Sequence, residues 1–419
     1  MGGLAWKLVW GRPRRAWLAI TSVAVGTAVV LVVLAALAGF AQYLFDRATG
    51  TLLGDGVVTA SASVAERRSG DVFDPAPVVA ALRSRLGAPS AAAPRLIVPV
   101  LVANGESERA AFLHGVDPAA EAELSRDVSG LATLTATGGG ATAAPGAEPR
   151  VLLSQVQAEA LHVAPGAEVE LTATDRFGLP RGARARVAGI YGSASRDVEA
   201  FVVIAGLDLA GTLLDARGLV HEVGFALPPA ERALDRVAGA VLRLGTALPG
   251  TGTPLHLSPW TAVSPAIVDY VNVNVAVYRV FLLVEVLLVA LAVADILWLG
   301  LEERLRDVGT VGALGASPRL LAGLVLAQAG WLLGIGVALG LVAGRAIVFY
   351  LERAGIPGLD ASAAFSVGGF SIGAGVTGRF EASQLAFAVG TVLAAGMLAA
   401  LIPAWRAWRL EPVEALRHR

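Results

Sequence analysis

Four long apolar stretches, with one long polar segment after the first, constrain this chain more than any single residue does. The stretches cover residues 16–42, 275–301, 320–348 and 384–405. Each is long enough to cross a bilayer as a helix, which takes about 20 apolar residues. The polar segment has ordinary mixed composition. We therefore expect a membrane protein with four transmembrane α-helices and a large α+β extracytoplasmic domain inserted between helices 1 and 2.

Composition excludes several classes of function. The chain has 419 residues, 16% of them charged and none of them cysteine, so disulfides, thiol catalysis and cysteine metal sites are excluded. Its formal net charge of -1 gives no electrostatic case for binding nucleic acid. Lys7 is the only lysine and lies between Trp6 and Leu8, so there is no Walker A loop. We expect no cofactor, no metal and no enzymatic activity on this chain.

The positive charges near the apolar stretches predict the topology. Arginine and lysine close to helix ends mark the cytoplasmic side. If four helices cross the membrane, three basic groups fall on one side: Lys7, Arg12, Arg14 and Arg15; Arg304, Arg306 and Arg319; and Arg406, Arg409, Arg417 and Arg419. This predicts a multi-pass protein of the plasma membrane, which is the inner membrane in bacteria, with both termini cytoplasmic. The first apolar stretch exceeds the 7–15 residues of a signal-peptide core, so we expect it to be retained.

The expected order of segments follows from this topology. Residues 1–15 form a cytoplasmic amphipathic helix, in which Trp6 and Trp10 share a face and which Pro13 ends or turns into the first span. The remaining segments are transmembrane helices at 16–43, 269–301, 319–350 and 384–405, the inserted domain at 44–268, a cytoplasmic segment at 302–318, an outer loop at 351–383 and a tail at 406–419. Residues 366–372 fit a loop, a re-entrant piece or a helix extension, and their glycines argue against a fifth span.

The inserted segment mixes strand and helix patterns. Alternating or β-branched runs predict strands at 95–102, 169–174, 184–191 and 200–204. Helices are expected at 76–86, 121–126, 154–161 and 230–244. The Gly, Ala and Pro-rich segment 137–149 reads as a loop or a boundary between two lobes.

No catalytic constellation is evident in that domain. The histidines are scattered without metal-ligand spacing, and Ser154 and Ser193 lack a Gly-x-Ser-x-Gly context. His114 fits a surface or turn histidine better than a general base. The pairs Glu106/Glu108 and Glu121/Glu123 are most simply solvated faces.

Two acidic residues lie within the second apolar stretch. Glu285 and Asp295 would be costly in hydrocarbon and should face protein or water. Ten residues apart, they point to nearly opposite sides of a helix. A polar contact between subunits or a conformational relay fits Glu285 as well as a plain structural role does, whereas Asp295 most simply reaches water at the membrane boundary. The stretch would extend about 40 Å at 1.5 Å per residue, a length suited to transmitting force.

The segment between the second and third stretches carries the most specific motif. Residues 302–317 read EERLRDVGTVGALGAS, a dense charged run followed by closely spaced small residues. This run resembles the coupling segment of the FtsX/MacB-type permeases of ABC transporters, with Asp307-Val308 where Glu-Ile is commoner. The ending from Ile402 to Arg417 is similar to the family's closing motif. The segments 112–118 and 151–191 are similar to elements of its lipoprotein-releasing, LolC/LolE-like branch.

The resemblance implies a function and a set of partners. The outer domain would be a MacB-like periplasmic core, and the turn after the second helix would dock on a separate ABC ATPase dimer that carries ATP and Mg. The docking residues would be Glu302, Glu303, Arg304, Arg306, Asp307, Gly309, Gly312, Ala313, Gly315 and Ala316. Other expected partners are a second permease subunit, in a homodimer or heterodimer, membrane lipids, and a periplasmic adaptor or lipoprotein.

Three functions fit this sequence. The first is a permease subunit that couples ATP hydrolysis to extraction or export of a hydrophobic or lipid-linked substrate, as in lipoprotein release. The second is an FtsX-like regulator that activates an extracytoplasmic partner such as a cell-wall hydrolase. A membrane-anchored sensor without an ATPase is the third, and it leaves the charged turn unexplained.

Overall fold

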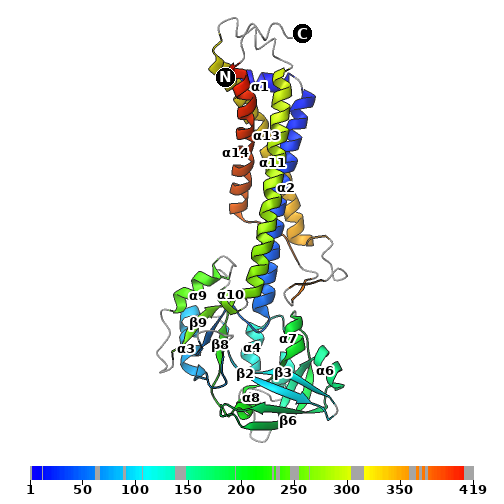
Figure 1. The fold of residues 1–419 in the computed structure, drawn as a ribbon, viewed down its shortest axis with the longest axis vertical. Coiled ribbons are helices and arrows are strands. Elements are labelled where there is room, and N and C mark those ends of the chain that lie inside the picture. The colour runs from blue at the N-terminus through cyan, green and yellow to red at the C-terminus, as the bar shows by residue number, and fades with distance from the viewer. Residues whose placement is uncertain are drawn as a thin grey trace. The chain divides into compact units, whose positions relative to one another are not determined.

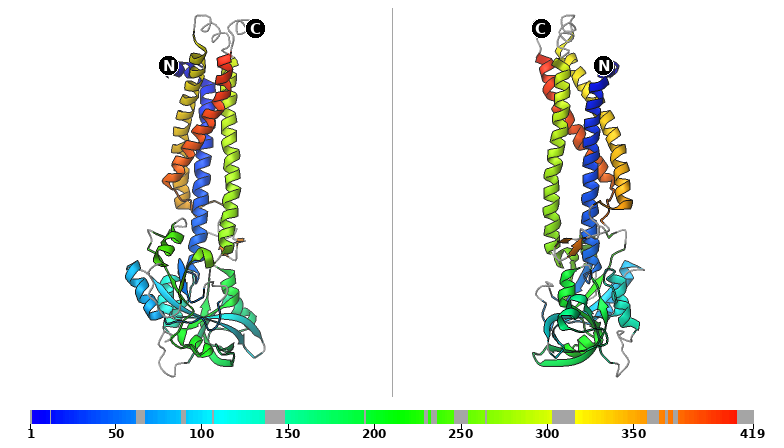
Figure 2. Two further views of the ribbon diagram at one scale, coloured as in Figure 1. Left: turned by 60° about the vertical axis from the view of Figure 1, so that its left-hand side comes forward. Right: turned by 90° about the vertical axis from the view of Figure 1, so that its right-hand side faces the viewer.

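The protein is described from a computed structural model (Figures 1 and 2). The described residues are 2–11, 13–61, 67–87, 91–105, 107–136, 148–193, 195–228, 231–232, 236–245, 254–263, 265–302, 316–357, 365–367, 370–372 and 376–409. The chain divides into two compact units. The helical unit comprises Met1–Phe40, Asn272–Asp360 and Ala374–Arg419, and the mixed unit comprises Ala41–Val271 and Ala361–Gly373.

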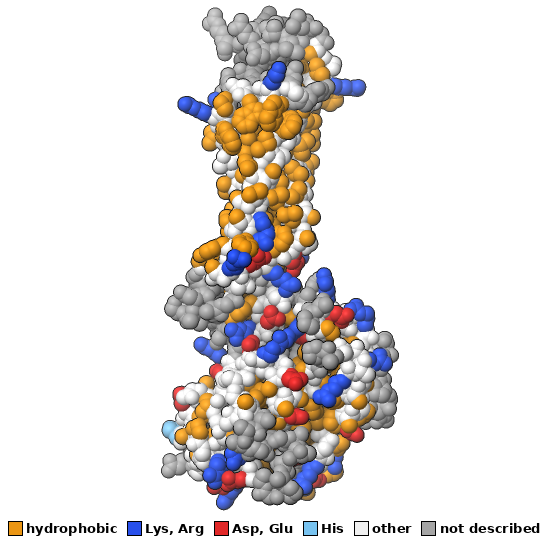
Figure 3. All heavy atoms as spheres, turned by 180° about the vertical axis from the view of Figure 1, so that it is seen from behind, with side chains coloured by type: hydrophobic (Ala, Val, Ile, Leu, Met, Phe, Trp, Pro, Cys, Tyr) orange, Lys and Arg blue, Asp and Glu red, His pale blue; other side chains and the backbone are white. Residues whose placement is uncertain are grey.

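The helical unit contains the predicted apolar helices. A short helix α1 (Gly2–Trp10) precedes the four long helices α2 (Pro13–Gly50), α11 (Pro265–Glu302), α13 (Pro318–Ala354) and α14 (Ala382–Arg409). Each of the four is long and apolar enough to cross a membrane. On the face seen in Figure 3, apolar side chains cover the outside of these helices. The expectation of a membrane protein with four candidate spanning helices is thereby confirmed.

The helices α2 and α11 are longer than predicted. Each has 38 residues, or about 57 Å at 1.5 Å per residue, against a hydrocarbon thickness of about 30 Å. Both continue past the residues of the helical unit into those of the mixed unit. The apolar runs in the sequence marked only the part of each helix that suits lipid. Hydropathy does not reveal that a helix continues beyond its apolar run into polar residues.

Tryptophan side chains join α1 to the long helices. The rings of Trp6 and Trp10 meet edge to face with centroids 5.6 Å apart, which confirms that they share a face. Trp6 also contacts Trp331 of α13 at 4.9 Å, and Trp10 contacts Trp17 of α2 at 5.8 Å. The new helix begins at Pro13, because proline is favoured in the first turn, where its missing N–H is not needed.

Three glycines of α13 allow close approach to α2. Gly336, Gly340 and Gly344 recur every four residues and therefore lie on one face. A Cβ atom at Gly340 would lie 2.5 Å from the carbonyl oxygen of Ala24 and 2.6 Å from the Cβ of Thr27. Small residues let helix backbones pack closely in a membrane, where van der Waals contact rather than the hydrophobic effect drives association.

A nine-stranded sheet organises the mixed unit, in the order β3-β7-β4-β6-β5-β2-β8-β1-β9. Its strands are β1 (Gly56–Thr59), β2 (Ala92–Ala103), β3 (Glu108–Val116), β4 (Arg150–Ser154), β5 (Glu168–Thr174), β6 (Pro180–Tyr191), β7 (Val202–Gly206), β8 (Glu222–Phe225) and β9 (His256–Pro259). Strand β3 also pairs with β2, so the six strands from β3 to β2 close into a ring. The remaining three extend the sheet from the first half of β2, through Ala92–Arg95.

Two hydrophobic cores match this arrangement. One fills the ring of six strands, with Leu96, Leu113 and Val187 among its members. The other lies under β8, β1 and β9 and contains Phe225 and Trp260. Both clusters include residues of β2, and further buried clusters lie around Tyr191 and Leu124, so the division into two lobes stays a prediction. Residues 137–147, where a boundary was predicted, lie outside the described part of the chain.

Eight helices of the mixed unit flank the sheet in the described residues: α3 (Pro75–Leu86), α4 (Pro118–Leu124), α5 (Leu131–Ala136), α6 (Gln155–Leu161), α7 (Arg196–Phe201), α8 (Leu207–Leu214), α9 (Val237–Gly245) and α10 (Trp260–Val263). Ser154 caps α6 in a capping box, a structural role that agrees with its lack of a nucleophile motif. The strand predicted at 200–204 begins only at Val202, because Ser195 caps a helix that continues to Phe201.

The described parts of the segment 366–372 are strands, which is none of the three expected forms. Strands β10 (Phe365–Val367) and β11 (Phe370–Ile372) pair antiparallel. Alternation of serine with apolar residues suits such a strand pair. Gly368 and Gly369 lie outside the described residues.

A buried ion-pair network joins β2, α4 and β8. The fully buried Arg95 donates from Nε to Glu121 Oε2 at 2.9 Å and from Nη2 to Oε1 at 2.7 Å. Its Nη1 donates to the Leu52 carbonyl at 2.6 Å and lies 3.4 Å from Glu222. Burial alone would lower the pKa of Arg95, but the two carboxylates raise it overall. Arg67 completes the network, 2.5 Å from Glu222.

Two predictions for this region were wrong. Glu121 is fully buried rather than on a solvated face, although Glu123 on the same helix is exposed as expected. His114 lies within strand β3 with its Nδ1 buried, rather than in an exposed turn. Burial, followed by the nearby charges of Arg95 and Arg67, lowers the pKa of His114 to about 3. Glu121 pairs with Arg95, and His114 lies near Arg95 and Arg67. These neighbours are distant in sequence, so no local sequence pattern reveals them.

Candidate functional site

The candidate site is the end of the helical unit at which α11 stops and α13 starts. Of the residues predicted to dock on an ATPase, Glu302 and Ala316 are described. The others lie outside the described residues: Glu303, Arg304, Arg306, Asp307, Gly309, Gly312, Ala313 and Gly315. The geometry that can be examined is therefore that of the two flanks of residues 303–315.

The first flank is held by a cluster of Trp298, Glu302 and Arg406. Trp298 and Glu302 are four apart on α11 and share a face, and the indole Nε1 donates to Glu302 Oε1 at 2.9 Å. Arg406 of α14 places its Nη1 3.7 Å from the same oxygen. Its guanidinium carbon also lies 4.2 Å from the centroid of the Trp298 ring. The last residue of α11 before the coupling segment is thus tied to the last helix of the chain.

This cluster fixes geometry more than it stabilises the fold. The side chains of Arg406 and Glu302 are 40% and 44% exposed, and an exposed ion pair contributes about 0–1 kcal/mol. An exposed cation–π contact contributes about 0.5–1 kcal/mol. A small apolar cluster beside it contains Leu301, Val325, Ala404 and Ala407. Packing of this cluster therefore stabilises the end of α11, and the polar contacts of Glu302 set its orientation.

The second flank is the capped N-terminus of α13. Ser317 is the N-cap, with extended backbone, and its Oγ accepts a hydrogen bond from the Leu320 amide at 3.4 Å. Pro318 follows at the first helical position, where its fixed φ favours initiation. Ala316 is half-buried just before the cap. Both ends of the predicted coupling segment are therefore anchored to α-helices.

The intramembrane acidic residues are not brought together. The half-buried Glu285 faces α2, with its Oε1 3.5 Å from the position that a Cβ atom on Gly26 would occupy. Asp295 is exposed on the surface of the helical unit. Their separation on the helix agrees with the prediction that they cannot share one seam.

Sequence reasoning missed Trp298 and placed Arg406 only in the topology and in the closing motif that resembles the family. The signal that could have found Trp298 is its position four residues before Glu302 on a helix. The contact with Arg406 depends on how α11 and α14 pack, which no spacing along the chain encodes. Within the described residues there is no group of three or more histidine, aspartate or glutamate side chains that could hold a metal.

A comparison with known families matches residues 279–412 to the FtsX-like permease C-terminal domain. The matched residues include all of α13 and α14 and most of α11. They also include the Trp298–Glu302–Arg406 cluster and the segment 303–315. No curated protein matches the chain. The C-terminal part of this chain is therefore similar to the FtsX-like permease domain, which supports a relationship to the FtsX/MacB/LolC type of permease.

Proposed function

We propose that this chain is a permease subunit of an ABC transporter, in which ATP hydrolysis on a separate ATPase dimer drives extraction or export of a hydrophobic or lipid-linked substrate. The chain itself binds no nucleotide and has no enzymatic activity. It sits in the plasma membrane with both termini cytoplasmic and the mixed unit outside, and it pairs with a second permease subunit. The LolC/LolE-like branch is the part of the family that we favour.

The observation that carries this proposal is that both flanks of residues 303–315 are anchored within the matched domain. A segment that receives force from a partner must be held at both ends, since otherwise it would yield instead of transmitting the movement. Here Glu302 is tied to α14 through Trp298 and Arg406, and Ser317 caps α13 at the other end. Residues 302–317, of which 303–315 lie outside the described residues, are the proposed docking element.

The continuous helices offer a route for the movement. Both α2 and α11 run without a break from the residues of the helical unit into those of the mixed unit. A helix is stiff along its axis because each turn is hydrogen-bonded to the next. In our proposal, displacement of residues 303–315 by the ATPase moves α11 and so reaches the mixed unit.

Purification of the tagged chain from its native membranes in mild detergent tests the proposal. We expect an ATP-binding subunit to co-purify in stoichiometric amount, and Arg304→Glu or Gly309→Trp to remove it while the permease remains folded. A chain that purifies without any ATPase would refute the ATPase-coupled function. Co-purification of the ATPase together with an extracytoplasmic hydrolase, and no bound lipid, would instead favour the regulatory alternative.

The anchor itself has a matched test. Arg406→Gln removes the contacts with Glu302 and Trp298, which together contribute about 0.5–2 kcal/mol, so ATPase binding should weaken roughly 2- to 30-fold. Arg409→Gln is the control, because Arg409 is near the end of the same helix and stacks on Trp405 instead. Equal affinities of the two variants for the ATPase, measured by titration in nanodiscs, would contradict the role of the anchor.

A further inference from the structure

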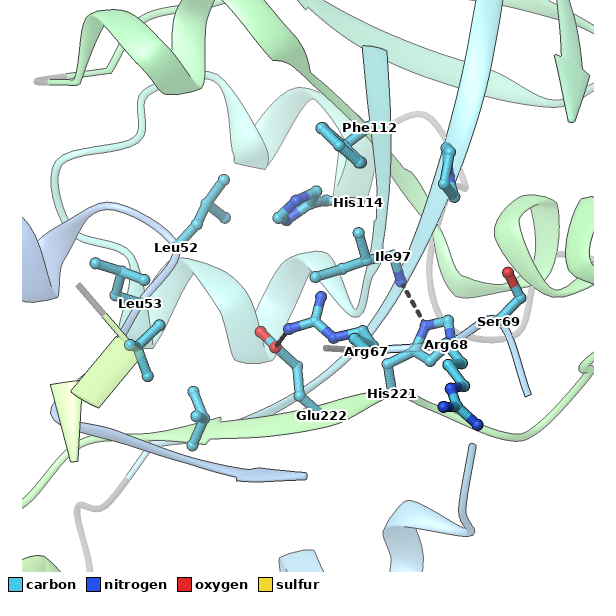
Figure 4. Close-up of a pocket in the computed structure, with 13 residues that line it drawn as sticks. Leu52, Leu53, Arg67, Arg68, Ser69, Ile97, Phe112, His114, His221 and Glu222 are labelled. Carbon is cyan, nitrogen blue, oxygen red and sulfur yellow. Dashed lines mark hydrogen bonds and ion pairs between the residues drawn. The ribbon is translucent and has the colours of Figure 1, made fainter. Parts of the chain in front are cut away.

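A pocket of about 420 Å³ opens in the mixed unit beside the buried ion-pair network. Its lining comes from residues 52–53 after α2, from β1, β2, β3 and α10, from residues 221–222 at the start of β8, and from residues 67–69 (Figure 4). The pocket is mixed in character. Apolar side chains such as Leu52, Ile97 and Phe112 lie around it together with Arg67, His114 and His221.

Three buried nitrogen atoms at this pocket have no hydrogen-bond partner among the described residues: Nε of Arg67, Nδ1 of His114 and Nε2 of His221. Buried polar atoms in folded proteins are paired in the large majority of cases, and each exception needs an explanation. Three such atoms around one hollow indicate that a bound ligand supplies their missing hydrogen-bond partners.

The tautomer of His221 makes its free nitrogen a donor. His221 is 2% exposed, and its Nδ1 accepts a hydrogen bond from the Ile97 amide at 3.2 Å. Burial, followed by the charge of Arg67, lowers its pKa to about 4, against smaller raising contributions from the Ser69 carbonyl, Glu222 and Asp71. The neutral ring therefore carries its proton on Nε2, where no hydrogen bond of normal geometry forms.

Unpaired N–H donors at the pocket, rather than an excess of charge, favour an acceptor such as a phosphate or carboxylate oxygen. Arg67 and the exposed Arg68 line the pocket, and Arg95 lies behind it. Three carboxylates oppose these three cations: Glu222, which is held by Arg67 and Arg95, Glu121, which is held by Arg95, and Asp71, whose charge acts on His221. The charges are thus balanced in number, but the Nε–H group of Arg67 remains free to donate after the Glu222 contact is made.

An apolar surface continues from the pocket. A second hollow of about 590 Å³ shares Pro99 and Phe112 with the first and is otherwise lined by small or apolar residues of β2, β3 and β5 together with Phe201. Phe112 is 49% exposed and Phe201 is 54% exposed. Large aromatic side chains exposed beside a concave surface indicate a binding site.

We propose that these two hollows form one binding site for an anionic amphiphile, whose phosphate or carboxylate head meets Arg67, His114 and His221 and whose alkyl chain lies over Phe112 toward Phe201. The unpaired N–H groups of Arg67 and His221 select the head, and the exposed aromatic surface selects the chain. This deepens the proposed function, on whose hydrophobic or lipid-linked substrate it rests, but its test requires no ATPase and so can fail independently of the ATPase coupling.

Photolabelling of the full chain tests this site. The protein is placed in phosphatidylcholine nanodiscs with a dodecyl phosphate that carries a diazirine at the end of its chain. After irradiation, labelled peptides are identified by mass spectrometry. We expect label in β2, β3 or α7, removed by excess dodecyl phosphate but neither by dodecanol nor by inorganic phosphate. Equal competition by dodecanol would reduce the site to an apolar surface and overturn the proposed head group, and label only in the long helices would overturn the site.

Variants test separately the binding of the head group and the binding of the alkyl chain. Arg67→Gln should lower the apparent affinity for dodecyl phosphate tenfold or more, and Phe112→Asp should lower labelling similarly without disturbing the core, because Phe112 is half exposed. Arg109→Gln is the matched control, since Arg109 is exposed on β3 outside both hollows. Unchanged labelling in Phe112→Asp, or equal losses in Arg67→Gln and Arg109→Gln, would overturn the proposal. Competition by an acidic peptide instead of the alkyl phosphate would also overturn it in favour of a protein partner.

Discussion

Replacing Gly340 by alanine should separate α2 from α13. The added Cβ would meet the Ala24 carbonyl oxygen at 2.5 Å and the Cβ of Thr27 at 2.6 Å, whereas ordinary contacts lie at 3.4–4 Å. Both obstacles are the backbone or its first side-chain atom, so neither can rotate away. The helices must therefore move apart by about 1 Å, and a gap of this size forfeits about a quarter to a half of each atom-pair attraction.

The size of the effect follows from the contacts along this crossing. About 60 atom pairs at about 0.15 kcal/mol each, reduced by about a third, give a loss of about 3 kcal/mol. This agrees with the cost of about 1–3 kcal/mol that is typical of overpacking. Gly334→Ala is the matched control, because no atom lies within 4 Å of its added Cβ. Both variants gain the same helix propensity, up to about 1 kcal/mol, so their difference isolates the crowding.

The assay is reversible unfolding by sodium dodecyl sulfate in mixed micelles. Tryptophan emission reports the helical unit, because Trp6, Trp10, Trp17 and Trp331 form contacting pairs there. We expect Gly340→Ala to unfold at a lower detergent fraction than Gly334→Ala, by a free-energy difference of about 2–3 kcal/mol. Equal stabilities would refute the close packing of α2 on α13 and the argument built on it.

Two further predictions concern the mixed unit. Glu121→Gln leaves the fully buried Arg95 without its bidentate carboxylate and should cost about 3–5 kcal/mol in urea unfolding, whereas Glu123→Gln on the same helix should stay within about 0.5 kcal/mol; equal effects would contradict the network. Folding lowers the pKa of His114 to about 3 and the pKa of His221 to about 4. Below pH 6.5 the unfolded chain therefore binds more protons than the folded chain, so the free energy of unfolding should be highest above pH 6.5 and fall as the pH drops toward 4. The fall should reach up to about 1.4 kcal/mol per pH unit for each histidine. His221→Asn should make this dependence shallower in urea unfolding measured at pH 7, 6 and 5, and an unchanged slope would show that His221 is not buried in its neutral form.

The sequence by itself determined the features that depend on local chemistry. Apolar runs of sufficient length predicted four helices, because a helix in lipid must satisfy its own hydrogen bonds and present apolar side chains along its whole length. Alternation predicted strands such as β5, since neighbouring side chains of a strand point to opposite faces. The motif of residues 302–317 indicated the FtsX-like family through residues that are contiguous in the chain.

Only the tertiary structure decided what depends on distant partners. Glu121 reads as a solvated residue until β2 brings Arg95 against it, and His114 reads as a surface or turn residue until folding brings Arg95 and Arg67 near it. Trp298 and Arg406 lie in different helices, and their meeting at Glu302 depends on the packing of α11 on α14. The physical reason is common to all three: a local pattern records a residue's own preference for water, whereas burial, ion pairs and pKa shifts depend on side chains that folding brings from elsewhere in the chain.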